Sequence, residues 1–131
     1  MATEHGGGIY ANNTDLTLTN SLIRGNSVTD PDNTGQRKDG GGVYADLSYL
    51  NLIDITISEN TAEIGGGAYL EHTRLSSINM LVSENTAEGE GGGMYLDSSY
   101  TTIFLSTISD NTSGSRGGGL KICRRRRQMS S

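Results

Sequence analysis

The chain has 131 residues and a formal net charge of −5, and 33% of its residues are hydrophobic. This length fits one domain, and the sequence contains no segment long and apolar enough to span a membrane. The first 120 residues carry all fifteen acidic side chains and only five basic ones, which argues against nucleic-acid binding by this part of the chain. Nineteen glycines, six tyrosines and no tryptophan favour tight corners and stacked strands over a helical bundle.

A repeat of 25 or 26 residues dominates the sequence. Three consecutive glycines occur five times, and an asparagine follows twenty residues after the first glycine in the first four copies. A unit of this length buries its apolar side only by stacking on its neighbours, so the pattern predicts a solenoid. The copies begin at Gly6, Gly40, Gly65, Gly91 and Gly117, and the asparagines are Asn26, Asn60, Asn85 and Asn111.

Residues 1–5 form a short N-terminal lead, and residues 6–122 form the repeat domain. The lead has neither a charged start nor an apolar run, so no secretory signal is visible. A repeat array normally needs polar capping units, and neither end shows one, so we expect the chain to be a segment of a longer protein. The single cysteine, Cys123, cannot form an internal disulfide, which leaves stacking as the source of stability.

Three short strands are predicted in each copy. Counting the first glycine as zero, apolar residues at positions three and five alternate with polar ones, as in a half-buried strand. Apolar rows at positions ten and twelve, and at fifteen and seventeen, predict two more strands, although Ser77 interrupts the row at twelve. The expected fold is all-β: a single-stranded parallel β-helix of about four complete rungs plus a partial fifth, with equivalent strands about 4.8 Å apart. A leucine-rich horseshoe is disfavoured because its leucine spacing is absent.

Two segments depart from the repeat. An insertion at about residues 27–39 contains Asp30-Pro31-Asp32, which we interpret as a solvated turn and not as a metal site. Residues 123–131 form a basic tail in which Arg124 to Arg127 end the apolar pattern. We expect this tail to be a disordered solubilising end, an arm that docks onto the acidic body, or the product of a shifted reading frame, in preference to a nuclear or polyanion signal.

The asparagine row predicts a structural ladder. A side-chain amide can donate and accept at once, so identical amides one rung apart can hydrogen-bond along the stack while a corner residue adopts a left-handed backbone. Substrate binding by these asparagines is the less favoured interpretation, because they adjoin an inward-facing row.

The two motifs together resemble those of known repeat families. Gly-Gly-Gly plus an apolar residue, followed by Ile/Val-x-x-Asn, is similar to the GGA(I/L/V) and FxxN motifs of chlamydial polymorphic outer membrane protein repeats. It also resembles right-handed parallel β-helix proteins, which include the pectate lyase-like superfamily. The resemblance implies a right-handed coil and an extracellular or cell-surface location. The third glycine replaces alanine, and isoleucine or valine replaces phenylalanine, at Ile23, Ile57, Val82 and Ile108.

Aromatic and acidic side chains predict a ligand-binding stripe on the outward face of the first strand. Rings could stack on sugars while carboxylates accept hydroxyl hydrogen bonds, so the surface could bind a glycan or a surface protein. A tyrosine ladder that only stabilises the sheet is the favoured alternative. The stripe comprises Tyr10, Tyr44, Tyr69 and Tyr95 together with Asp46, Glu71 and Asp97.

A second acidic row lies beside the asparagine corner, at Glu59, Glu84 and Asp110. Like charges one rung apart repel, so they are either solvated, which is the favoured case, or bridged by a cation such as calcium. No other cofactor is expected.

The function predicted from these features is a non-catalytic structural or surface-binding, adhesin-like module. The alternative is a fragment of a polysaccharide lyase or glycoside hydrolase that uses Asp46, Glu71 and Asp97 with His72 and Arg74. We disfavour catalysis because the acids follow the regular repeat. The open ends of the stack also predict self-association through unpaired strand edges.

Overall fold

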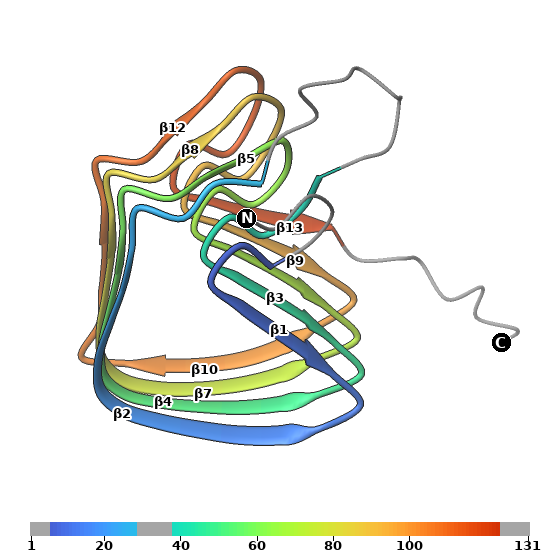
Figure 1. Cartoon of the computed structure of the whole chain (residues 1–131), viewed down its shortest axis with the longest axis vertical. Coiled ribbons are helices and arrows are strands. Elements are labelled where there is room, and N and C mark those ends of the chain that lie inside the picture. Colours follow the sequence, from blue (N-terminus) through green and yellow to red (C-terminus); the bar gives the residue numbers. More distant parts are fainter. Residues whose placement is uncertain (1–5, 29–37, 124–131) are drawn as a thin grey trace, which may run out of the picture.

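The computed structural model describes residues 6–28 and 38–123, and this part of the chain is a parallel β-solenoid without helices. Figure 1 shows successive coils that lie over one another, so that equivalent strands stack into three sheets. The lead 1–5, most of the insertion, and the tail beyond Cys123 lie outside the described residues. No helix in the described part is long and apolar enough to cross a membrane. The all-β stacked fold predicted from the repeat is confirmed.

The first sheet contains the strand that follows each glycine triplet. Its five strands pair in parallel and in repeat register, so each residue lies beside the residue one repeat further on: Tyr44, for example, pairs with Tyr10 and Tyr69. The buried residues at positions three and five point to the core, as the alternation predicts. The strands are β1 (Ile9–Asn12), β3 (Val43–Asp46), β6 (Ala68–Glu71), β9 (Met94–Asp97) and β13 (Leu120–Cys123).

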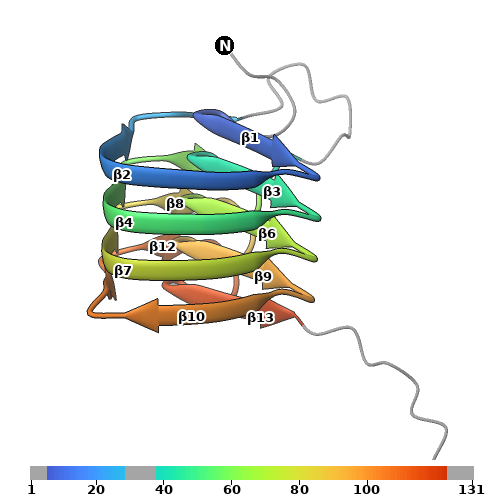
Figure 2. The same cartoon turned by 90° about the horizontal axis from the view of Figure 1, so that it is seen from below.

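The second sheet merges the two further strands that the sequence predicted separately. Its ten-residue strands turn a corner at a left-handed residue, with φ of 48° at Asn20, 57° at Asp54 and 56° at Asn79. A single left-handed residue redirects the chain while parallel pairing resumes on either side. Figure 2 shows these strands stacked in order. They are β2 (Asp15–Arg24), β4 (Tyr49–Ser58), β7 (Arg74–Ser83), and the divided pair β10 (Tyr100–Phe104) and β11 (Thr107–Ser109).

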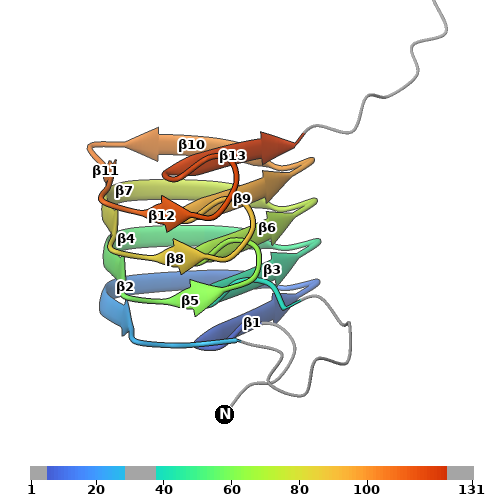
Figure 3. The same ribbon diagram turned by 90° about the horizontal axis from the view of Figure 1, so that it is seen from above.

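A third sheet of two-residue strands was not predicted. It contains β5 (Thr61–Ala62), β8 (Thr86–Ala87) and β12 (Thr112–Ser113), stacked as in Figure 3. About three turns therefore contribute to all three sheets, fewer than the four complete rungs expected. The first coil reaches this face only through the bridge between Ser27 and Thr61, and the fifth contributes β13 alone.

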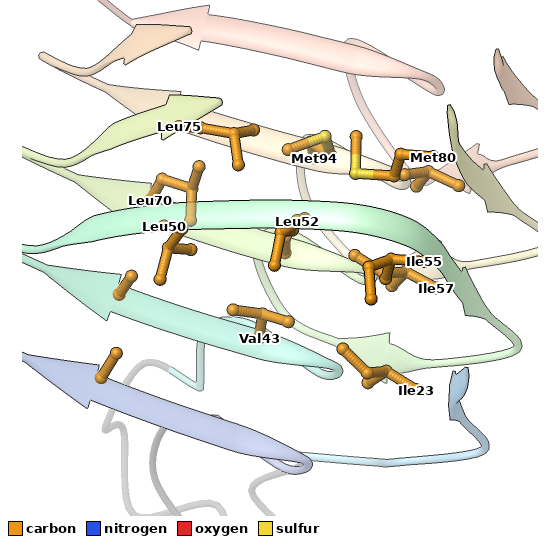
Figure 4. Close-up of a cluster of buried hydrophobic side chains, with 14 of the residues drawn as sticks. Ile23, Val43, Leu50, Leu52, Ile55, Ile57, Leu70, Leu75, Met80 and Met94 are labelled. Atoms are coloured by element: carbon orange, nitrogen blue, oxygen red, sulfur yellow. The ribbon is translucent and has the colours of Figure 1, made fainter. Parts of the chain in front are cut away.

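The core lies between the first and second sheets. Figure 4 shows its aliphatic side chains lying one above another from coil to coil. Ile55, Leu70 and Val82 are at most 1% exposed. Burying a side chain of this size contributes about 1.5–3 kcal/mol, so repetition of the same few positions stabilises the whole stack. Cys123, the last residue of β13, pairs with Asp97 of β9.

The glycine triplet is required by close backbone contact. The first glycine of each triplet is left-handed, for example Gly65 with φ of 68°. A Cβ on the next residue, Gly66, would lie 2.4 Å from the carbonyl oxygen of Thr86 and 2.5 Å from that of Gly92. No side chain fits there, so the coils can approach only through glycine.

The asparagines form a hydrogen-bonded ladder along one corner of the solenoid. The Asn60 side chain donates from Nδ2 to Asn85 Oδ1 at 3.0 Å, and its backbone N–H donates to the same oxygen at 3.0 Å. Its Nδ2 also donates to the carbonyl oxygen of Ile23 at 3.0 Å. The same amide contacts join Asn26 to Asn60 and Asn85 to Asn111. Because Asn60 and Asn85 are fully buried, these bonds satisfy groups that water cannot reach.

A second ladder, made of hydroxyl groups, lies at the corner between the first and second sheets. The backbone N–H of Ser48 donates to Thr73 Oγ1 at 3.3 Å, and that of Thr73 donates to Ser99 Oγ at 3.1 Å. The backbone N–H of Thr14 donates to Ser48 Oγ at 3.2 Å. Small hydroxyl residues at position eight of the first four copies were the signal for this ladder, and the sequence interpretation did not use it.

We expect Asn85→Ala to destabilise the solenoid strongly. The change leaves the backbone N–H of Asn60 and the carbonyl oxygen of Ile57 without their partners in a buried site. Each such group costs about 1–3 kcal/mol, so the free energy of unfolding should fall by roughly 3 kcal/mol or more. Urea unfolding followed by circular dichroism measures it. Asn51→Ala, on the outward side of β4, is the matched control and should change it by less than about 0.5 kcal/mol. Equal small effects would contradict the ladder's importance.

We expect Ser77→Ala to stabilise the protein. Ser77 is 1% exposed and lies in register between Leu52 and Ile103, and its buried hydroxyl makes no hydrogen bond within the described part of the chain. Removing an unsatisfied buried hydroxyl should raise the free energy of unfolding by about 1 kcal/mol. The neighbouring Ser76→Ala, on the outward side, should leave it unchanged. A loss of stability in Ser77→Ala would show that the hydroxyl has a partner.

Candidate functional site

The tyrosines of the first sheet are stacked ring on ring. Successive ring centroids lie 5.3, 5.4 and 5.2 Å apart from Tyr10 through Tyr44 and Tyr69 to Tyr95, and the last two pairs are within 2° of parallel. Tyr44 is 8% and Tyr69 is 1% exposed, whereas Tyr10 is 56% exposed. This is the geometry of the stabilising ladder that was the favoured alternative. The ring faces of Tyr44 and Tyr69 are covered by their neighbours and cannot stack on a sugar. Ligand binding along the rest of this stripe stays a prediction.

Lys121 continues this row in place of a fifth tyrosine. It pairs with Tyr95 in register, and its Nζ lies 3.5 Å from Glu90 Oε2.

Burial, followed by the charges of Glu71 and Asp46, raises the pKa of Tyr44 to about 12. Burial also raises the pKa of Tyr95 to about 12, with a contribution from its hydrogen bond with Cys123. Both phenols therefore stay neutral well above neutral pH.

The acidic row at the end of the first-sheet strands is uneven. Asp46 and Glu71 are half-buried neighbours in register, and Asp97 is 8% exposed with its Oδ1 accepting a hydrogen bond from Ser98 Oγ at 3.1 Å. His72 follows Glu71, and its Nδ1 lies 3.7 Å from Glu71 Oε2 and 4.0 Å from Asp46 Oδ1. We call Asp46, Glu71 and His72 the carboxylate–histidine cluster.

The second acidic row occupies left-handed backbone positions. Glu59, Glu84 and Asp110 have φ of 55°, 55° and 56°, and Gly25 takes this place in the first coil. The left-handed corner residue is thus the one before each ladder asparagine. Arg24 donates to Glu59 through a side-chain hydrogen bond, which raises the pKa of Arg24. Within the described residues, the carboxylate–histidine cluster is the one group of three potential metal ligands, and Glu59, Glu84 and Asp110 do not belong to it. Calcium binding by Glu59, Glu84 and Asp110 stays a prediction.

Sequence reasoning overlooked the outer face of the second sheet. Tyr49, Arg74 and Tyr100 lie side by side in register at the start of β4, β7 and β10. All three are exposed, Tyr49 by 41% and Tyr100 by 72%. Arg74 makes no ion pair with the described residues, so it does not join Asp46 and Glu71 as the enzyme hypothesis required. The outward alternation in these strands could have revealed this face. We call Tyr49, Arg74 and Tyr100 the tyrosine–arginine row.

The sequence matches no protein-family model, and neither a curated protein nor a solved structure is significantly similar to it. The fold therefore stands on its own geometry, that of a parallel β-solenoid.

We expect the solenoid to lose stability as the pH rises from about 10 to about 12. A phenol whose pKa is raised to about 12 by folding, from 10.0 in the unfolded chain, adds stability that is fully present below pH 10 and is lost as the pH rises through the folded value. Thermal unfolding between pH 8 and 12, with tyrosine absorbance recorded in parallel, measures it. Tyr44→Phe should flatten the loss, whereas Tyr100→Phe, on the exposed face, should not. A pH-independent melting temperature in this range would contradict the burial of the stack.

Proposed function

We propose that this chain is a non-catalytic repeat module that binds an extended acidic glycan through the outer face of the second sheet. The observation that carries the proposal is the tyrosine–arginine row: two exposed rings that flank one cation, Arg74, which makes no ion pair with the residues that the structure describes. The rings belong to strands two coils apart, a separation of about 10 Å at the usual strand spacing. Aromatic faces pack on sugar rings, and a guanidinium binds a carboxylate through paired hydrogen bonds.

Polar groups beside this row complete a surface suited to hydroxyl groups. Asn51, Ser76 and Thr102 lie in register two residues further along the same strands, and their side chains both donate and accept hydrogen bonds. The face is formed by hydrogen-bonded parallel strands, so its side chains have fixed spacings before a ligand arrives. A preorganised surface avoids part of the entropy cost of binding.

Between the strand starts and the corner, the outward residues of β4, β7 and β10 include no carboxylate, and the acids nearest to them are Asp15, beside Tyr49 in β2, and Asp54 at the corner of β4. The spacing of these two acids along the face supports binding without turnover. Hydrolysis of a glycosidic bond normally needs two acidic side chains on opposite sides of it. The outward residues from the starts of these strands to the corner are Tyr49, Asn51, Ile53, Arg74, Ser76, Ile78, Tyr100, Thr102 and Phe104.

The wider assignment follows the motif resemblance. We place the chain among right-handed parallel β-helix proteins of the pectate lyase-like kind, with repeats similar to those of the polymorphic outer membrane proteins. A surface-exposed or secreted, adhesin-like role accords with this resemblance and with an outer face that offers aromatic rings to solvent. On the first sheet, Tyr10, the half-buried Tyr95 and the half-buried Asp46 and Glu71 remain accessible to a ligand of this kind.

We expect the full chain to bind oligogalacturonate more tightly than a neutral oligosaccharide of equal length. Tyr49→Ala or Tyr100→Ala should each weaken binding roughly 3- to 10-fold, which corresponds to about 0.5–1.5 kcal/mol for an aromatic contact. Arg74→Gln should remove the preference for the acidic sugar. Isothermal titration calorimetry, with tyrosine fluorescence as a second readout, measures these affinities.

Tyr10→Ala is the matched control, because it changes an exposed tyrosine of the first sheet. A loss of affinity in Tyr10→Ala alone would move the site to the first-sheet stripe. No binding across acidic and neutral glycans would end the proposal. Cleavage of polygalacturonate by the native chain that is lost in Glu71→Gln would favour the polysaccharide lyase or hydrolase alternative.

A further inference from the structure

The carboxylate–histidine cluster brings three different donor groups together at one corner of the first sheet. Asp46 ends β3 and Glu71 ends β6, and parallel pairing places them side by side. His72 occupies the next, left-handed position, with φ of 46°, and turns its Nδ1 toward both carboxylates. One ligand atom from each side chain lies within 4.8 Å of the other two.

We propose that Asp46, Glu71 and His72 bind a divalent transition-metal ion, with Zn²⁺ as the test case. Two ligands that each lie about 2.1 Å from a tetrahedral metal are about 3.4 Å apart. The distances from His72 Nδ1 to the two carboxylates, 3.7 and 4.0 Å, exceed this by well under 1 Å. These side chains are 25–41% exposed, so small rotations can close the gap.

The orientation of Glu71 is an independent observation that supports a ligand site. The hydroxyl of Tyr69, a residue only 1% exposed, donates to Glu71 Oε1 at 3.4 Å. The other oxygen, Oε2, is the one that lies near His72. A hydrogen bond from a buried group to the far oxygen of a carboxylate is the arrangement that orients metal ligands in proteins.

The site occurs at one level of the stack because the repeat changes there. At the positions of Glu71 and His72, the first coil has Asn12 and Asn13. Amides bind transition metals poorly compared with carboxylate and imidazole. In the fourth coil Asp97 is buried, and Ser98 stands in the place of the histidine. Imidazole with two carboxylates favours Zn²⁺, Mn²⁺ or Fe²⁺ over Ca²⁺ and Mg²⁺, which prefer oxygen ligands alone. Solvent exposure leaves the remaining coordination position to water.

The test compares Zn²⁺ binding by the full chain and by His72→Asn, after removal of metals with chelator. Asn13 occupies the equivalent left-handed position with φ of 53°, so asparagine suits the backbone and the variant should fold. We expect His72→Asn to bind Zn²⁺ more weakly by roughly tenfold or more in isothermal titration calorimetry. Substitution with Co²⁺ should give the visible absorption bands of a nitrogen- and oxygen-ligated ion in the native chain and not in the variant. Asp46→Asn, which copies Asn12, should also weaken binding.

Two controls separate this site from other ligands in the chain. His5 is the only other histidine and Cys123 the only cysteine, so His5→Asn and Cys123→Ser should retain native affinity. Absence of Zn²⁺ binding in the native chain, or equal affinity in His72→Asn, would overturn the proposal. So would a loss of binding in either control instead, because the ion would then be held elsewhere. None of these outcomes depends on whether the chain binds glycan.

Discussion

The in-register stacking of like residues is the constraint on which the rest of this structure depends. Each coil hydrogen-bonds to the next through parallel backbones. At one corner, the fully buried side-chain amides of Asn60 and Asn85 also hydrogen-bond to the asparagine of a neighbouring coil and to the backbone of a neighbouring coil. A shift of one residue in any coil would misalign the amides and would also send the core side chains outward. The glycine triplets allow this stacking because no Cβ fits between successive corners. Sequence repetition and close contact between coils are thus the same physical requirement.

This constraint also decides where function can arise. A residue type repeated in every coil has identical neighbours above and below it. These neighbours cover the faces of its side chain, as in the tyrosine stack. Chemistry becomes available where one coil differs from the next. His72 stands where the other described coils have Asn13, Leu47 and Ser98, and Arg74 stands between two tyrosines. His72 and Arg74 both belong to the coil that begins at Gly65, and each site also includes residues of the neighbouring coils.

Much of the fold could be predicted because the period specifies the register directly. The inward rows, such as Val43, Ala68 and Met94, followed from alternation alone. The third sheet could not be found this way, because two residues such as Thr86 and Ala87 are too few to show a period. The burial of Tyr44 and Tyr69 depends on what covers the outward side of a strand, which alternation does not describe. The left-handed corner residue could not be identified from local preference, because glutamate, as at Glu84, adopts that backbone less readily than the asparagine beside it.

The amide ladder gives the stack a direction. Every described rung donates from the earlier asparagine to the oxygen of the later one, from Asn26 through Asn111. The amide dipoles therefore align instead of cancelling, and the two terminal amides differ. Asn26 has an Oδ1 that can accept a hydrogen bond, whereas Asn111, which already donates to the carbonyl oxygen of Val82, has a second Nδ2 hydrogen that can donate. A coil placed beyond Asn111 can extend the ladder only by offering a carbonyl-type oxygen. Two like ends brought face to face would oppose acceptor to acceptor or donor to donor. The ladder can therefore continue only where an end with a free donor meets an end with a free acceptor.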